Sequence, residues 1–315
     1  MKVAVLDDYQ RVALSMADWS RVVDRAQVDA FDDHVSGEED LVRRLEAYDV
    51  VVVMRERTPL PATVIERLPA LRLIVTTGRR NPTIDVAAAR ARDIAVCGTR
   101  SLASAPVELT WALILGLSRH LVAESASMAR GGWQTTLGHD LSGRTLGVVG
   151  LGRIGSAVAR VGLAFGMEVL AWSANLTPQH AAEVGATPVT FERLLGEADV
   201  VTVHQVLSDR TRGLVGAPEL GLMKPTGLLV NTSRGPVIDT PALVSALAEG
   251  RIAGVGLDVY DEEPLPADHP LRSAPNALLT PHLGYVTEGV YRTFFGDVVE
   301  AVEAQLDGRP IPRPL

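Results

Sequence analysis

Short apolar runs alternate with amphipathic segments along most of the chain. Between the runs, segments such as Glu39–Tyr48 place Leu41, Val42 and Leu45 at helical spacing. Brief apolar runs bounded by turn residues are typical of parallel strands that are buried on both faces. In the first third of the chain, the predicted strands are Val3–Leu6, Val50–Met54, Leu73–Val75 and Ile94–Val96. This alternation predicts an α/β fold with doubly wound parallel sheets.

The pattern then becomes purely helical. It predicts one long helix from Pro106 to about Arg130, because proline suits the first helical turn and Gly131-Gly132 supplies a stop. Such a helix is long enough to carry the chain from one domain to another. Its broad apolar face comprises Trp111, Leu113, Ile114, Leu117, Leu121 and Val122.

A second series of strands follows this helix. A final helix is predicted over Glu288–Leu306, and the proline-rich residues Arg309–Leu315 cannot continue it. The predicted strands are Leu146–Val149, Glu168–Trp172, Val200–His204, Leu228–Asn231, Val255–Val259 and Ala277–Thr280.

Composition narrows the classes of function. Of the 315 residues, 47% are hydrophobic and 22% charged, as in ordinary globular proteins, and the net charge of −8 argues against nucleic-acid binding. The single cysteine, Cys97, excludes an internal disulfide and any multi-cysteine metal site, and its apolar surroundings predict a buried strand thiol. No signal peptide or membrane span is recognised, so we expect a cytoplasmic protein that binds neither membrane nor metal.

A glycine-rich loop joins the predicted strand Leu146–Val149 to a helical segment. The loop reads Gly150-Leu151-Gly152-Arg153-Ile154-Gly155. Gly150 permits a tight turn, Gly152 allows a pyrophosphate to approach the backbone, and Gly155 allows the helix to pack closely on the strand. The start of the helix offers free amide groups to an anion. Between a strand and a helix, this loop predicts dinucleotide binding rather than a simple tight turn.

The next strand ends in Ser173, where an acidic residue would grip the ribose hydroxyls of NAD. A neutral residue does not repel a 2′-phosphate, but no arginine follows to bind one. The expectation is therefore NAD(H), slightly favoured, with NADP(H) possible.

Three further segments follow predicted strands and should meet the glycine loop at one sheet edge. They are Asn231-Thr232-Ser233-Arg234-Gly235, Asp258-Val259-Tyr260-Asp261-Glu262-Glu263-Pro264 and Thr280-Pro281-His282-Leu283-Gly284. With the glycine loop, their order and spacing closely resemble the D-isomer-specific 2-hydroxyacid dehydrogenase family, which includes glyoxylate or hydroxypyruvate reductases and phosphoglycerate dehydrogenases. The resemblance covers nearly the whole chain and is strongest over Leu141–Ala171, Met223–Pro264 and Thr280–Gly284.

The resemblance implies a role for each of these residues. Arg234 would anchor the substrate carboxylate and carbonyl, His282 would donate the proton, and Glu263 would be the carboxylate partner of the histidine. Asp258 would hold the nicotinamide carboxamide. His204, Thr232 and Ser233 would line the path of the cofactor. It also implies a homodimer.

These residue types suit the reduction of a 2-oxo acid to a D-2-hydroxy acid, or the reverse reaction. Hydride reaches the carbonyl carbon from the nicotinamide, which carries the difficult chemistry, while charge develops on the oxygen. A protonated imidazole can neutralise that charge, and a carboxylate beside it supports the imidazolium. A guanidinium can grip a carboxylate with two hydrogen bonds. Singly, each residue could be structural, since a loop glutamate is usually solvated and a strand-end arginine or histidine often only packs.

Two positions depart from the family pattern. Members commonly carry a Gly-x-Gly loop in the first domain that holds the substrate carboxylate, whereas this chain has Gly78-Arg79-Arg80. Arg79 and Arg80 could point to solvent, or one could bind a second anionic group of the substrate. The turn after His282 is followed by the bulky Tyr285. Both departures bear on the identity of the substrate.

The resemblance implies a flavodoxin-like substrate domain at about 1–99 plus 286–315, with a Rossmann cofactor domain at about 100–285 inserted into it. The active site would lie in the cleft between them. Two other functions share this scaffold. One is a formate- or phosphite-oxidising dehydrogenase, and the other is a dinucleotide-sensing, corepressor-like binding protein.

Overall fold

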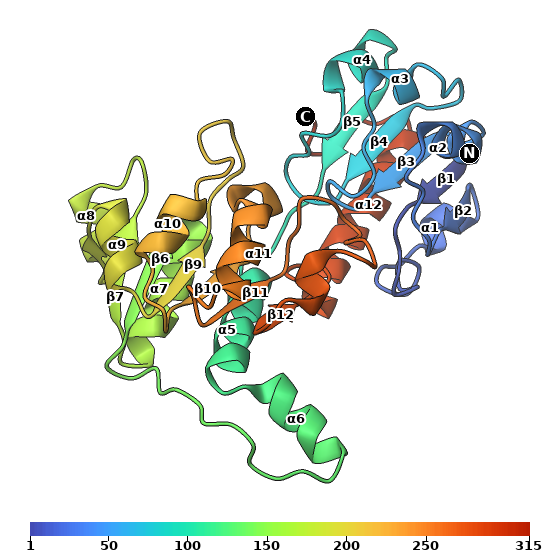
Figure 1. Cartoon of the computed structure of the whole chain (residues 1–315). Helices are drawn as coiled ribbons and strands as arrows, with labels where there is room; N and C mark the ends of the chain where they lie inside the picture. The colour runs from blue at the N-terminus through green and yellow to red at the C-terminus, as the bar shows by residue number, and fades with distance from the viewer. The chain divides into compact units, whose positions relative to one another are not determined.

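A computed structural model describes all residues from Met1 to Leu315, and the chain divides into two compact units (Figure 1). Unit 1 comprises Met1–Leu102 and Val286–Leu315, and unit 2 comprises Ala103–Tyr285. The sequence predicts junctions after residues 99 and 285.

Unit 1 contains a five-stranded sheet in the order β2-β1-β3-β4-β5, and every neighbouring pair is parallel. This is the flavodoxin-like order. Its strands are β1 (Lys2–Val5), β2 (Gln27–Ala30), β3 (Val50–Val53), β4 (Leu73–Thr76) and β5 (Ala95–Gly98). Its helices are α1 (Ser20–Val23), α2 (Glu38–Leu45), α3 (Ala62–Ile65), α4 (Val86–Ala91) and α12 (Glu288–Leu306).

Unit 2 contains a seven-stranded parallel sheet in the order β12-β11-β10-β9-β6-β7-β8. The strand order reverses between β6 and β9, which is the switch point where Rossmann folds bind dinucleotides. Its strands are β6 (Thr145–Val149), β7 (Glu168–Trp172), β8 (Thr187–Pro188), β9 (Val200–Val203), β10 (Leu228–Asn231), β11 (Gly254–Leu257) and β12 (Ala277–Leu279). Its helices are α5 (Ser104–Ser118), α6 (Leu121–Ala129), α7 (Arg153–Ala164), α8 (Pro178–Val184), α9 (Phe191–Glu197), α10 (Ala217–Leu222) and α11 (Thr240–Ala248), with 3₁₀ turns at Gly235–Val237 and Pro270–Ser273. The predicted fold of two parallel α/β sheets is confirmed.

Apolar cores cover both faces of the unit 2 sheet. Val148 belongs to the cluster that includes Trp111 of α5 and Val158 of α7, whereas its neighbour Val149 belongs to the cluster on the other face. Successive residues of a strand point to opposite faces, so a strand covered by helices on both sides must be apolar throughout. This burial explains why the central strands were recognisable as continuous apolar runs.

Two edge strands escaped sequence analysis. In β2, Gln27 and Ala30 are exposed, and β8 has only two residues, both exposed. An edge strand is covered less completely and carries a weaker apolar signal.

The prediction of one helix from Pro106 to about Arg130 is wrong. Helix α5 ends at Ser118, and His120 takes a left-handed backbone conformation (φ 49°) before α6 begins at Leu121. A residue with positive φ cannot lie within a right-handed helix, so the chain changes direction there. Leu121 and Val122, expected on the buried face, are instead exposed.

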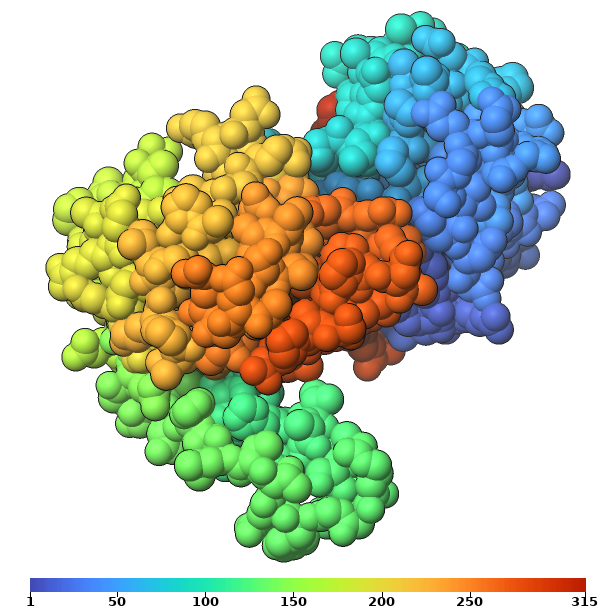
Figure 2. All heavy atoms as spheres, in the orientation of Figure 1, coloured from blue at the N-terminus to red at the C-terminus, as the bar shows by residue number.

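Helix α6 and the segment after it form an arm, residues 121–140, that extends from the body of unit 2 (Figures 1 and 2). No residue of α6 is buried. Trp133 and Leu137 are 72% and 88% exposed. The arm therefore exposes several large apolar side chains to solvent, which is unusual for a protein surface. No helix of the chain is both long and apolar enough to span a bilayer.

The C-terminal segment lies along β5 of unit 1. Gly98 donates a backbone hydrogen bond to Arg313 (3.1 Å), and Leu315 donates one to Val96 (2.9 Å). Cys97, between these two positions, is fully buried in β5 as predicted, and burial raises the pKa of its thiol to about 12. Cys97 therefore stays protonated and is not a nucleophile.

Candidate active site

The carboxyl ends of the unit 2 strands bring most of the expected site residues to one edge of the sheet. Because every pair of neighbouring strands is parallel, these ends all face the same way. Gly150 follows β6, Ser173 follows β7, His204 follows β9, Thr232–Arg234 follow β10, Asp258 follows β11, and Thr280–His282 follow β12.

The geometry of the glycine loop gives its glycines three different roles. Gly150 has a φ of 105°, which favours glycine. A β-carbon on Gly155 would lie 2.0 Å from the carbonyl oxygen of Gly150, so this position tolerates no side chain. A β-carbon on Gly152 would meet no protein atom within 4 Å. Gly152 therefore leaves open space at the start of α7, where no side chain caps the first-turn amides of Arg153 and Ile154. Open backbone beside an uncapped helix start fits a pyrophosphate.

Ser173 contacts the glycine loop directly. Its Oγ accepts a hydrogen bond from the backbone amide of Leu151 (2.8 Å). The hydroxyl hydrogen of Ser173 remains available to another acceptor, whereas an acidic residue here would offer only acceptors. Ser173 stands where a carboxylate would bind the ribose of NAD. Its hydroxyl instead has a structural role, because it holds the amide of Leu151 in the glycine loop.

His204 carries no charge near neutral pH. Desolvation lowers the pKa of its imidazole to about 4. A hydrogen bond joins its Nε2 to Thr202 Oγ1 (2.9 Å). His204 can therefore accept or donate a hydrogen bond beside the sheet edge, but it does not supply a proton there.

The turn that carries Arg234 is shaped by the buried amide of Asn231. Asn231 Oδ1 accepts hydrogen bonds from the amide and hydroxyl of Ser233 (2.9 and 2.7 Å), and its Nδ2 donates to the carbonyl of Arg234 (2.9 Å). A further hydrogen bond joins Thr232 Oγ1 to Thr110 Oγ1 of α5 (2.8 Å). The guanidinium of Arg234 donates to the carbonyl of Ser233 (2.7 Å). This network fixes the backbone from which the arginine projects.

His282 and Glu263, predicted to act together, are joined. The imidazole Nδ1 lies 2.5 Å from Glu263 Oε2, and the second carboxylate oxygen accepts the backbone amide of Tyr260 (3.0 Å). The hydroxyl of Tyr260 donates to the carbonyl of Thr280 (2.9 Å). Because Nδ1 is occupied by the carboxylate, Nε2 is the nitrogen left to exchange a proton with another molecule.

Asp258 holds the turn on which His282 stands. Its fully buried carboxylate accepts hydrogen bonds from Thr280 Oγ1 (2.6 Å) and from the amides of Leu283 (2.6 Å) and Gly284 (2.8 Å). Burial raises the pKa of the Asp258 carboxyl, and the donated bonds oppose that rise. His282 itself has a left-handed φ of 54°, which this anchored turn maintains.

The remaining expected residues lie in unit 1, after β4. Gly78 is buried with a φ of 98°, and a β-carbon there would stand 2.8 Å from Nη1 of Arg55. Arg79 and Arg80 are exposed. Arg55 lies two residues after the neighbouring strand β3.

Sequence analysis also missed the supporting residues Asn231, Tyr260, Thr280 and Thr110. The first three lie inside the recognised motifs, but their role is to hold neighbouring residues in place. Thr110 lies in α5, far from the motifs in sequence, and nothing in the sequence pairs it with Thr232.

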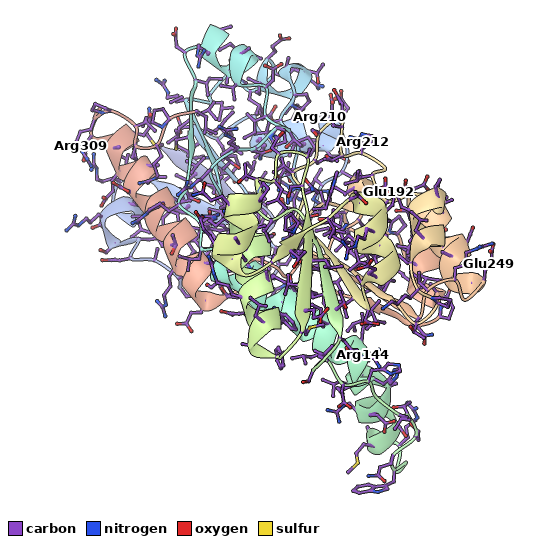
Figure 3. The ribbon with its side chains drawn as sticks, turned by 90° about the vertical axis from the view of Figure 1, so that its left-hand side faces the viewer. Arg144, Glu192, Arg210, Arg212, Glu249 and Arg309 are labelled. Carbon is purple, nitrogen blue, oxygen red and sulfur yellow. The ribbon has the colours of Figure 1, made fainter.

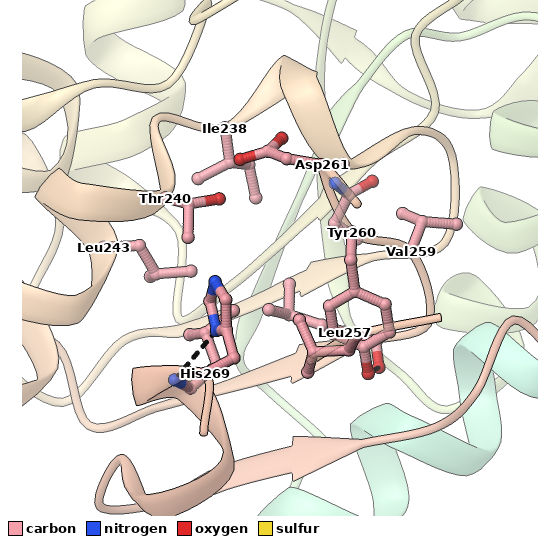
Figure 4. A pocket seen from close by; sticks show the side chains of 12 residues that line it. Ile238, Thr240, Leu243, Leu257, Val259, Tyr260, Asp261 and His269 are labelled. Carbon is pink, nitrogen blue, oxygen red and sulfur yellow. Dashed lines mark hydrogen bonds between the residues drawn. The ribbon is translucent and has the colours of Figure 1, made fainter. Parts of the chain in front are cut away.

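A small pocket lies beside the loop that carries Glu263 (Figure 4). Its lining includes Leu257, Tyr260 and His269, whose Nδ1 accepts the amide of Leu271 (3.2 Å). None of the expected catalytic and cofactor residues lines it, so this pocket is not the candidate site.

On the outside of the unit, exposed charged side chains include Glu192, Arg210, Arg212 and Glu249 (Figure 3).

Comparisons with known proteins agree with this geometry. Residues 111–284 match the model of the "D-isomer specific 2-hydroxyacid dehydrogenase, NAD binding domain" family. A glyoxylate reductase of Aeropyrum pernix is 42% identical over 233 residues, which cover 71% of this chain and 70% of the relative. A crystal structure of a phosphoglycerate oxidoreductase from Vibrio cholerae superposes with a TM-score of 0.93 at 38% identity, covering 98% of this chain and 99% of the other. A Granulicella formate dehydrogenase has a TM-score of 0.86 at only 26% identity, covering 99% and 96% of the two chains.

Proposed function

Because this chain belongs to the D-isomer specific 2-hydroxyacid dehydrogenase family, we propose that Arg234, Glu263 and His282 are its catalytic residues. The chain is an oxidoreductase that transfers a hydride between a nicotinamide cofactor and a 2-oxo or D-2-hydroxy acid. The single observation that most supports the assignment is the hydrogen bond between His282 and Glu263, on the sheet edge that also carries the Arg234 turn. The lower identity to a formate dehydrogenase does not favour the formate alternative.

The cofactor would occupy the sheet edge around the switch point. We propose that the glycine loop and the amides at the start of α7 bind the pyrophosphate and that Ser173 faces the adenosine ribose. His204 and Asp258 would lie along the nicotinamide half, with Asp258 also accepting from the carboxamide. When bound, the cofactor supplies or accepts the hydride. The proposed cofactor residues are Gly150, Gly152, Arg153, Ile154, Gly155, Ser173, His204, Thr232, Ser233 and Asp258.

The protein's own part of the reaction is to hold the oxo acid and move one proton. Arg234 would bind the carboxylate, and its charge would also stabilise the developing alkoxide. In the reducing direction, Nε2–H of His282 would donate its proton to that oxygen, and the imidazole would be left neutral. Glu263 would stabilise the imidazolium before transfer and fix the ring so that Nε2 faces the substrate.

For the substrate we propose a short 2-oxo acid, since the relatives named above include a glyoxylate reductase. Arg79 and Arg80 refine this proposal. If one of these exposed guanidinium groups binds substrate, an oxo acid with a second carboxylate or a phosphate gains about ten- to hundredfold in kcat/KM over pyruvate.

The test is steady-state oxidation of NADH and of NADPH with glyoxylate, pyruvate, 2-oxoglutarate and phosphohydroxypyruvate. Turnover of at least one oxo acid is expected, and its absence with all four would contradict the proposed substrate class. Arg80→Gly should remove any preference for the dianionic substrates while sparing the small monoacids. Identical rankings in both proteins would show that Arg80 does not contact the substrate.

We also propose a homodimer formed through the arm. Its exposed apolar residues need a partner surface, and the sequence resemblance implies a second copy of this chain. The exposed apolar residues of the arm are Leu121, Val122, Met128, Trp133 and Leu137. Light scattering after gel filtration should give twice the mass of the chain, and Trp133→Asp with Leu137→Asp should give the monomer. A monomeric wild type would refute the dimer.

A further inference from the structure

The peptide groups on either side of Leu151, the residue between the first two glycines of the cofactor loop, are both held by side chains. The amide of Leu151 donates to Ser173 Oγ (2.8 Å), as described above. The carbonyl of Leu151 lies 2.9 Å from Nε2 of His180, a residue of α8. Because a carbonyl oxygen only accepts, Nε2 must carry the hydrogen and donate it.

The local structure of α8 aims His180 at the loop. Thr177 caps the helix, and its Oγ1 accepts the backbone amide of His180 (3.2 Å). The imidazole Nδ1 lies 3.6 Å from Glu183 Oε2, one turn later on the same helix. Nε2 thus points toward the loop, whereas the carboxylate beside Nδ1 attracts the ring only when the imidazole is protonated; the side chain of His180 is 45% exposed.

A second donor reaches the same carbonyl. Ser156, in the first turns of α7, donates from Oγ to the carbonyl of Leu151 (3.2 Å) and lies 3.4 Å from Nε2 of His180. The carbonyl therefore keeps one partner if His180 is removed. The tie from the loop to α8, however, passes through His180, whereas Ser156 ties the loop only to the helix that the loop itself begins.

We propose that His180 is a positioning residue for the dinucleotide, because its Nε2 and Ser173 Oγ together clamp the two polar backbone atoms of Leu151. The clamp would hold the loop in the shape that leaves the space at Gly152 open. This inference rests on the proposed cofactor site. It assigns His180 no contact with the cofactor, so NADH and NADPH should depend on it equally.

Two substitutions separate the bond from the bulk of the ring. The amide nitrogen of His180→Gln can occupy the place of Nε2 and keep the donated bond. The side chain of His180→Asn is one methylene shorter, and its amide can match only Nδ1. His139→Asn makes the same substitution at an exposed histidine outside the loop and serves as the control.

The experiment measures NADH and NADPH dissociation constants by titration calorimetry, together with kcat and cofactor KM. His180→Asn should weaken both cofactors by about three- to tenfold, the size of one ordinary hydrogen bond, with kcat nearly unchanged. His180→Gln and His139→Asn should bind both cofactors as the wild type does. His180→Ala, compared at matched thermal stability, should behave as His180→Asn.

Three results would overturn the proposal. The first is a His180→Asn protein that binds both cofactors normally. The second is a larger loss for NADPH than for NADH, which would mean that His180 contacts the 2′-phosphate. The third is equal weakening by Gln and Asn, which would mean that the ring packs without donating. A wild type that binds neither cofactor would overturn the proposed function as well, whereas normal wild-type binding isolates the role of His180.

Discussion

Gly235 touches the backbone of Tyr260 so closely that a β-carbon on it would stand 2.1 Å from the carbonyl carbon of Tyr260. This contact joins the turn that carries Arg234 to the loop that carries Glu263. Two candidate catalytic residues from different strands are thereby held in a fixed relation by a position that has no side chain.

Replacing Gly235 with alanine should therefore disturb both segments. The backbone must shift to admit the methyl group, at a cost of about 1–3 kcal/mol, and kcat/KM should fall more than stability alone explains. Urea denaturation and steady-state kinetics measure the two effects. Gly221→Ala on α10, where a β-carbon meets nothing within 4 Å, is the control and should lower neither stability nor kcat/KM. Wild-type kinetics in Gly235→Ala would contradict the coupling.

His282→Ala should lower kcat by about 10²–10⁴-fold, because it removes the proposed general acid. The dissociation constant for NADH should stay nearly unchanged, since His282 stands on the turn after β12 and not on the glycine loop. Glu263→Gln should show a smaller loss, because the ring keeps an acceptor without charge. Its matched control is Glu262→Gln, an exposed neighbour. Near-normal kcat in His282→Ala would refute the assigned role.

Substitution by valine should weaken NADH binding at Gly152 but lower the stability of the protein at Gly155. At Gly152 a β-carbon meets no protein atom within 4 Å, so the variant should fold normally yet bind NADH at least about tenfold more weakly. At Gly155 the β-carbon would lie 2.0 Å from a carbonyl oxygen, so the variant should lose stability outright. Thermal melting with NADH titration distinguishes the two. Unchanged NADH affinity in a folded Gly152→Val protein would remove the cofactor loop assignment.

Ser173→Asp should increase the preference for NADH over NADPH. One carboxylate oxygen can still accept the amide of Leu151, and the other can accept a ribose hydroxyl and repel a 2′-phosphate. The wild type, which has no carboxylate here, should discriminate weakly or modestly in favour of NAD. The measurement is the ratio of kcat/KM for the two cofactors, with Ser173→Asn, which adds a side chain of similar shape without charge, as the control. A wild type that prefers NADPH a hundredfold would contradict this local explanation.

His204 should make the folded state less stable in acid. Its pKa is lowered to about 4, whereas histidine in an unfolded chain titrates near about 6.5. Above that value the ring is neutral in both states and has no effect. As pH falls from about 6.5 to 4, the unfolded chain gains a proton that the folded chain cannot take, and stability declines by up to about 3 kcal/mol.

Urea midpoints measured across this pH range provide the test. His204→Gln should flatten the decline, because glutamine does not titrate and can still bond Thr202. His139→Gln, at an exposed position, should leave the decline as it is. A decline that is equally steep without His204 would locate the acid sensitivity in another group.

The sequence alone determined the class of fold and the inventory of the site. The central strands are covered on both faces, so both their inward- and outward-facing residues are apolar. Such strands are recognisable in the sequence as uninterrupted apolar runs. The glycine loop and the segments around Arg234, Glu263 and His282 each follow such a run. Parallel strands end at one edge, so the motifs could be expected together without any knowledge of distances.

Only the tertiary structure decided which atoms meet. Helix α5 is packed against the core of unit 2, whereas no residue of α6 is buried. A local helical pattern does not reveal where this packing ends, so it did not predict the break at His120 or the exposed arm. Tyr260 and His180 act through the backbone carbonyls of Thr280 and Leu151, which the fold brings beside them. Such contacts are set by packing between elements distant in sequence, and a polar side chain has the same local signature whether it meets solvent or a carbonyl.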